Sequence, residues 1–74
     1  HTQPCDGVVA NILAETLKHL STEISELIRP GGWIAMSGIL ESQIDSVKTA
    51  YQKTIDFDQP TILDDWVLLT GTKK

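Results

Sequence analysis

A short apolar run that ends in a single asparagine constrains the fold of this chain more than any other feature. Residues 7–10 are Gly-Val-Val-Ala, Asn11 follows, and a helix-compatible pattern begins at once. A buried parallel strand is typically such a continuous apolar run, and ligands of open α/β sheets bind beyond the carboxyl ends of these strands. Asn11 carries a donor and an acceptor at that place. We therefore predict a strand over residues 6–10 that leads to a ligand crevice.

The same strand-then-helix pattern occurs a second time. A predicted helix over residues 13–28 separates the two copies and ends at Pro30 and Gly31, which do not continue a helix. A second apolar strand is predicted over residues 33–37, and Gly38 permits a tight turn after it. The apolar positions of the first helix are spaced by fours and threes, which places them on one face: Leu13, Leu17, Leu20, Ile24 and Leu27.

The rest of the chain contains one more helix and two extended segments. Its helix repeats the four-three-four spacing, and residues 55–63 and 66–70 are predicted strands. Asp64 and Asp65 between them indicate a hairpin turn, and Pro60 confines the first of these strands to an edge or a bulge. The predicted fold class is α/β, with two parallel βα units followed by an antiparallel β-hairpin. The apolar positions of the second helix are Leu40, Ile44, Val47 and Tyr51.

Size and charge exclude several classes of protein. The chain has 74 residues and a formal net charge of −4, which predicts one small domain and no extended nucleic-acid surface. No apolar run is long enough to cross a membrane, and no signal peptide opens the sequence. Cys5 is the single cysteine, so a disulfide framework within the chain is excluded and a cytoplasmic location is expected. Because the sequence starts with histidine, we expect it to begin inside a longer protein.

Four segments, taken in order, resemble the class I methyltransferases that use S-adenosylmethionine, and most closely the PrmA family that modifies protein eleven of the large ribosomal subunit. They read VVANILAE (residues 8–15), LIRPGGW (27–33), SGILE (37–41) and DWVLLTG (65–71). The resemblance implies a Rossmann-like sheet in which the strand at 66–70 inserts antiparallel beside 33–37, with 55–63 outside it. It also implies methyl transfer to lysine and N-terminal amines of that ribosomal protein.

The resemblance assigns roles to three consecutive residues. It implies that Asn11 contacts the cofactor and the incoming amine, as both a catalytic and a cofactor-binding residue, and that Ile12 and Leu13 line the substrate pocket. The family's Gly-rich cofactor loop and the acidic residue after its second strand have no counterpart here. We therefore expect the C-terminal part of a methyltransferase catalytic domain, residues 1–74, that is inactive alone.

Several of these residues also have a simpler, structural interpretation. Asn11 is also a favoured residue for capping the following helix, and its spacing makes Leu13 a candidate for the core. An acidic residue such as Glu15 commonly complements the dipole of a helix's first turn, although it is also suited to contact a cationic substrate. Ser37 and Gly38 either face the crevice or form the turn that requires glycine.

Other polar and aromatic residues carry weaker signals. His19 is predicted on the solvent side of its helix, and Asp64 and Asp65 fit turn chemistry better than a metal site. We expect Trp33 and Trp66 to pack on the sheet.

Two other functions remain open from the sequence. One is a class I methyltransferase with a different acceptor, such as a small molecule, and the other is a non-catalytic α/β interaction module. The strand at residues 7–11 is apolar and lacks lysine and proline, so self-association through its free edge is also expected.

Overall fold

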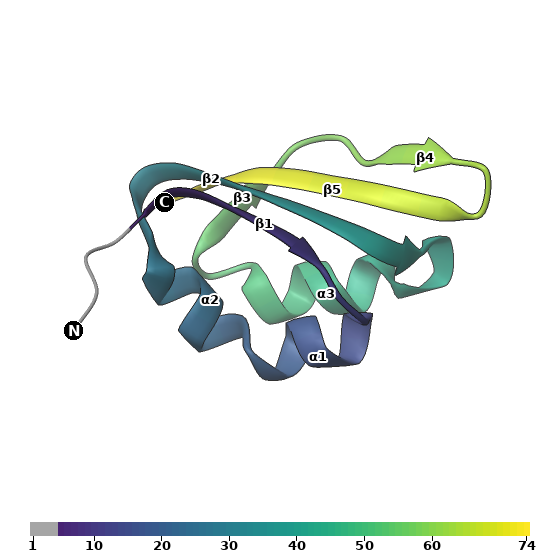
Figure 1. The fold of residues 1–74 in the computed structure, drawn as a ribbon, viewed down its shortest axis with the longest axis horizontal. Coiled ribbons are helices and arrows are strands. Elements are labelled where there is room, and N and C mark those ends of the chain that lie inside the picture. Colours follow the sequence, from purple (N-terminus) through teal and green to yellow (C-terminus); the bar gives the residue numbers. More distant parts are fainter. Residues whose placement is uncertain (1–4) are drawn as a thin grey trace.

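The helices of this protein all lie on one face of a β-sheet (Figure 1). The structure is a computed structural model that describes residues 5–74. Two short helices, α1 (Ala14–His19) and α2 (Ser21–Leu27), follow the first strand. A 3₁₀ turn, η1 (Glu41–Gln43), leads into α3 (Ile44–Tyr51) after the second strand. None of these helices is long and apolar enough to cross a membrane.

The strands form a mixed sheet whose order confirms the sequence prediction. β1 (Cys5–Asn11) pairs in parallel with β2 (Ile28–Leu40). β5 (Trp66–Lys73) lies antiparallel on the other side of β2, and β3 (Ile55–Phe57) pairs with β5 beyond it. β4 (Thr61–Leu63) also pairs with β5, outside the main path β1-β2-β5-β3. The two βα units and the terminal antiparallel strands are thus those expected for half of a Rossmann-like sheet.

The prediction of one helix over residues 13–28 is wrong, because the helix breaks at Leu20. This residue has φ −97° and ψ 16°, and it ends α1 and begins α2. Ser21 follows it, and serine favours helix starts over helix interiors. The hydroxyl of Tyr51 donates a hydrogen bond to the backbone oxygen of Leu17 over 2.6 Å. This bond from α3 supports the last turn of α1 just before the break.

The break also changes which side chains of this segment are buried. Leu17 and Ile24 belong to the core, as their spacing predicts. Leu13, Leu20 and Leu27 are instead 75%, 37% and 42% exposed, so the predicted five-residue apolar face is only partly buried.

The prediction of one strand over residues 55–63 is also wrong, because a three-residue link separates β3 from β4. Pro60 lies in this link, and proline cannot donate to a ladder. The link stays close to the sheet, since Asp58 N–H donates to the oxygen of Thr70 over 2.8 Å. The hairpin turn at Asp64 and Asp65 is confirmed, and Asp64 adopts a φ of 55°, which aspartate tolerates better than most residues.

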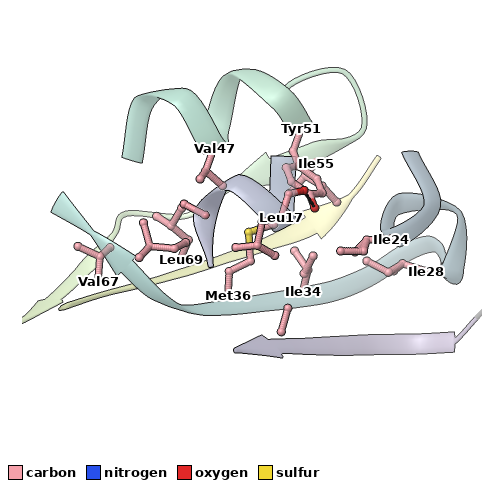
Figure 2. Packing of buried hydrophobic residues seen from close by; sticks show 13 residues of the cluster. Leu17, Ile24, Ile28, Ile34, Met36, Val47, Tyr51, Ile55, Val67 and Leu69 are labelled. Atoms are coloured by element: carbon pink, nitrogen blue, oxygen red, sulfur yellow. Dashed lines mark hydrogen bonds between the residues drawn. The ribbon is translucent and has the colours of Figure 1, made fainter. Parts of the chain in front are cut away.

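One hydrophobic cluster joins the helices to the sheet (Figure 2). Leu17 projects from α1 toward Met36 of β2, and Tyr51 packs from α3. The rings of Tyr51 and Phe57 meet edge to face with their centroids 6.4 Å apart. Leu40, predicted on the apolar face of the second helix, instead ends β2 and is 41% exposed. The buried apolar residues are Ala10, Ala14, Leu17, Ile24, Ile28, Ile34, Met36, Ile39, Val47, Tyr51, Ile55, Val67 and Leu69.

The face of the sheet opposite the helices is open within residues 5–74. Val9 is 70% exposed there, and Trp33 is 50% exposed. The Trp33 ring covers Gly7, its partner on β1, so closely that a side chain at Gly7 would overlap it. Trp33 therefore packs on the sheet as predicted, with one side of its ring in solvent.

Candidate functional site

The candidate site lies where β1 ends beside β2. Asn11, the last residue of β1, is in register with Ser37 of β2. Gly38 follows with a φ of +79°, a conformation that favours glycine. A β-carbon on Gly38 would lie 3.0 Å from Oδ1 of Asn11 and 3.6 Å from the backbone oxygen of Ile12. The carboxyl end of β1 and the neighbouring residues Ser37 and Gly38 of β2 therefore form one small polar centre.

The side chain of Asn11 is free to bind a ligand. It is exposed, and it makes no hydrogen bond to any residue that the structure describes. The N-cap of α1 is Leu13, without a side-chain cap bond, so the alternative that Asn11 caps this helix is wrong. An unpaired amide of this kind offers one acceptor oxygen and two N–H donors.

Ile12 and Leu13 connect this centre to α1. Ile12 is 38% exposed, and Leu13 is 75% exposed, so the alternative that Leu13 belongs to the core is wrong. The backbone oxygen of Leu13 accepts a hydrogen bond from the N–H of Leu17 over 3.0 Å. This bond fixes the backbone, while the apolar side chain of Leu13 remains in solvent.

Glu15 occupies the first turn of α1, where a carboxylate complements the helix dipole. Its carboxylate lies 3.1 Å from Nζ of Lys18, with a side chain that is 74% exposed. Exposed pairs of this kind contribute little to stability. Glu15 therefore keeps a largely solvated negative charge near the amino end of α1.

An apolar pocket of about 230 Å³ adjoins the polar centre. Gly38 belongs to both, and the pocket also contains Leu13, Ala14 and Glu15 from the start of α1. Sequence reasoning missed three further residues that line it: Leu40, Gln43 and Trp66. Trp66 is 55% exposed and pairs with Leu40 on one side and Leu63 on the other, so it lies at the start of the central strand β5.

A second pocket, of about 420 Å³, lies between α2 and α3, away from Asn11. Three of its polar residues, Ser25, Thr54 and Lys73, take part in hydrogen bonds. Nζ of Lys73 donates to the backbone oxygens of Ser25 and Ile28 over 2.5 and 3.0 Å. The hydroxyls of Ser25 and Thr54 are 2.9 Å apart. These bonds tie the end of α2 to the last strand, which is a structural role.

His19 and Cys5 lie outside the candidate site. His19 is exposed at the end of α1, and Cys5 is an exposed free thiol at the start of β1. Within residues 5–74, no three His, Cys, Asp or Glu side chains come together as a metal site. Tyr51, which is buried in the core, has a clearly shifted pKa. Burial, and secondarily the charge of Glu23, raises the pKa of Tyr51 to about 12.

Two solved structures that share this arrangement are methyltransferases. A ribosomal protein L11 methylase from Lactobacillus delbrueckii subsp. bulgaricus matches with a TM-score of 0.83 and 28% identity, over 93% of this chain and 36% of that one. The N-methyltransferase NodS from Bradyrhizobium japonicum matches with a TM-score of 0.72 and 13% identity, over 99% of this chain and 48% of that one. The second match concerns the fold alone. The fold is therefore that of the class I methyltransferases.

Sequence comparison gives the family within this class. All of residues 1–74 match the family described as ribosomal protein L11 methyltransferase (PrmA). Relatives bearing that name include one from Idiomarina loihiensis, 50% identical over 68 residues, and one from Alkalilimnicola ehrlichii, 45% identical over 69 residues. These matches cover 92% and 93% of this chain but only 23% and 24% of the relatives. The chain belongs to the PrmA family and spans about a quarter of the length of the curated relatives it matches.

Proposed function

We propose that the complete protein transfers methyl groups from S-adenosylmethionine to amines of ribosomal protein L11, its lysine side chains and N-terminal amine. Residues 1–74 then form the C-terminal part of its catalytic domain. The observation that carries this proposal is the unbonded amide of Asn11 beside Gly38, in a chain that matches the PrmA family throughout. Because ribosomal proteins are made in the cytoplasm, we assign the protein to that compartment.

The reaction depends more on the orientation of the substrate amine than on a strong acid or base in the protein. When bound, S-adenosylmethionine supplies an electrophilic methyl group on a sulfonium. The amine lone pair forms the new N–C bond as the S–C bond breaks, the sulfonium becomes a thioether, and the amine proton leaves to solvent. Holding the amine in line for this displacement provides much of the acceleration.

Asn11 is suited to hold the amine. Its Oδ1 accepts an N–H of the substrate, which fixes the direction of the lone pair. The amide N–H groups of Asn11 remain available to an oxygen of the cofactor. Gly38 leaves the space in front of Oδ1 open, because a side chain there would approach it to 3.0 Å. These features fit an amine acceptor and a cofactor on opposite sides of one amide.

Ile12 and Leu13 provide an apolar wall next to this amide. Both are exposed, at 38% and 75%, in a position where a substrate would cover them. Covering apolar surface contributes about 25 cal/mol per Å². These two residues are therefore assigned to substrate binding.

Most of the cofactor site belongs to the rest of the protein. The glycines of this chain are Gly7, Gly31, Gly32, Gly38 and Gly71, and none forms the G-x-G pattern that opens a helix beside a bound nucleotide. Residues 1–74 alone are then inactive, and they bind S-adenosylmethionine weakly.

The β1 edge gives the isolated chain a further property. Among residues 5–74, β1 pairs with β2 alone, and its other edge carries unpaired backbone groups. Such an edge recruits another strand. The isolated chain therefore self-associates through residues 7–11, with a second copy as the partner.

A grafted enzyme tests the proposed function. The 68 matching residues of the Idiomarina loihiensis relative are replaced by those of this chain, and the parent enzyme serves as the control. Methyl incorporation into purified L11 should be within about tenfold of the parent rate, a change of about 1.4 kcal/mol or less. A folded graft that binds S-adenosylmethionine yet leaves L11 unmethylated would contradict the proposal.

A further inference from the structure

The apolar pocket beside Asn11 has no role in the proposed binding of the amine and the cofactor. It holds about 230 Å³, and Gly38 forms the boundary between the pocket and the Asn11 amide. Its apolar walls come from three elements: Leu13 and Ala14 from the start of α1, Leu40 from the end of β2, and Trp66 from the start of β5. In Figure 1 the end of β2 and the start of β5 lie toward the right, and the start of α1 lies below them.

The walls of this pocket include three apolar side chains that are exposed. Leu13, Leu40 and Trp66 are 75%, 41% and 55% exposed. Contiguous exposed apolar side chains mark surfaces that bind a ligand or partner. The pocket therefore favours a ligand with an apolar segment.

One polar lining group is held in place. The Leu40 N–H donates to Oε1 of Gln43 over 2.9 Å, which fixes that side chain and leaves its amide N–H groups available. Glu15 adds a carboxylate that is 74% exposed at the pocket's mouth.

Three further acidic residues are neighbours of lining residues in the sequence. Glu41 directly follows Leu40, while Asp64 and Asp65 directly precede Trp66. All three are exposed. Negative charges near a binding site attract a partner of the opposite sign and raise the rate of encounter. The pocket is thus mainly apolar, with the carboxylate of Glu15 in its lining.

We propose that this pocket binds the aliphatic stem of a substrate lysine and directs its amine past Gly38 to Asn11. This inference rests on the proposed function, because that function places the reacting amine at Asn11. A lysine side chain combines an apolar stem with a cationic end, which matches the apolar walls and the exposed Glu15 carboxylate. Removal from water disfavours the charged ammonium, so the apolar walls also favour the neutral amine that reacts. Leu40 and Trp66 become residues that determine specificity.

Peptide binding to the grafted enzyme tests this assignment separately from turnover. The probe is a short peptide with one lysine, and the comparison peptide carries ornithine, one methylene shorter, at that position. Calorimetry should give about tenfold tighter binding of the lysine peptide, since one methylene in an apolar pocket changes affinity about ten- to two-hundredfold. Leu40→Ser and Trp66→Ala should each remove most of this preference.

Leu27→Ser is the matched control. Leu27 is 42% exposed, close to the 41% of Leu40, but it lies at the end of α2 outside the pocket. This variant should keep the lysine preference, and all variants should keep their affinity for S-adenosylmethionine. Unfolding temperatures identify any variant that fails to fold, and either pocket variant alone is sufficient for the comparison.

The outcomes separate the two proposals. Equal lysine preference in Leu40→Ser, Trp66→Ala and Leu27→Ser would overturn the pocket assignment even if the graft methylates L11. A graft that shows the predicted lysine preference but no methyl transfer would contradict the proposed function and support the pocket.

Discussion

Gly38 approaches Asn11 so closely that a β-carbon on the glycine would lie 3.0 Å from Oδ1 of the asparagine. The approach depends on a φ of +79° at Gly38, directly after the register pair Asn11 and Ser37. Glycine at position 38 therefore meets two requirements. It adopts the left-handed conformation of the turn, and its lack of a side chain leaves space beside the Asn11 amide. The two interpretations of Gly38 offered by the sequence are compatible.

Gly38→Ala should reduce methyl transfer by the complete enzyme. The new methyl group would press on the Asn11 amide, and the left-handed conformation would cost about 1–2 kcal/mol. Misplacing a reacting group by about 1 Å can lower a rate by about a hundredfold, so we expect a loss of that order in kcat.

Gly31→Ala controls for backbone strain in this experiment. Gly31 has a φ of +85°, and a β-carbon there would have Nη1 of Arg29, at 3.5 Å, as its nearest neighbour. The two variants should lose similar stability, whereas only Gly38→Ala should lose most of its turnover. Equal turnover in the two variants would separate Gly38 from the site.

The buried Tyr51 should make stability fall at high pH. Its pKa is raised from 10.0 to about 12 by burial, with a contribution from Glu23. Below pH 10 the phenol is neutral in both states, so its contribution to stability is complete. Between about pH 10 and pH 12 the unfolded state loses the proton first, and this contribution is lost. Denaturant unfolding of the complete enzyme across this range measures the effect.

Tyr51→Phe isolates the contribution of the hydroxyl. At neutral pH this variant should lose about 1–3 kcal/mol, because the bond to the oxygen of Leu17 disappears inside the core. The stability difference between the two proteins should shrink as the pH rises from about 10 to about 12. A difference that stays constant over that range would show that Tyr51 titrates equally in both states.

The 74-residue chain alone should bind S-adenosylmethionine weakly or not at all. Asn11 is the only cofactor contact proposed within it, and one amide provides too few interactions for tight binding. Calorimetry should give a dissociation constant above about 1 mM, equivalent to less than about 4 kcal/mol. Micromolar binding would mean that this segment carries most of the cofactor site.

The isolated chain should self-associate through β1. Val9→Lys should weaken this association, because Val9 is 70% exposed in the middle of the free-edged strand and a charge there opposes an apolar contact. Leu27→Lys, on α2, should leave it unchanged. Sedimentation velocity at increasing concentration distinguishes the two. A wild-type chain that stays monomeric would contradict self-association.

The sheet order was predictable because local patterns and the family resemblance agree. The apolar runs before Asn11 and Ser37 define two parallel strands, and Asp64 and Asp65 define the last turn. The break at Leu20 was not predictable, since the spacing from Leu17 to Ile24 is also compatible with one continuous helix. The hydroxyl of Tyr51 supports the break from a distant part of the chain, and periodicity contains no such information.

The pocket was missed for a similar reason. Leu40 and Trp66 become partners only after a register shift between Met36 and Ile39. Sequence spacing does not specify such an irregularity, so the two residues could not be placed together in advance. The position of Asn11, in contrast, could be predicted, because this residue ends the apolar run that forms β1.

Turnover of the grafted enzyme carrying Asn11→Ala tests the central claim most directly. Gln59→Ala, which removes another exposed amide from the link between β3 and β4, is the control. The account predicts a loss of about a hundredfold in kcat for Asn11→Ala, an unchanged unfolding temperature, and normal turnover for Gln59→Ala. If Asn11→Ala instead methylates L11 as fast as Gln59→Ala, Asn11 does not orient the amine and the proposed site is wrong.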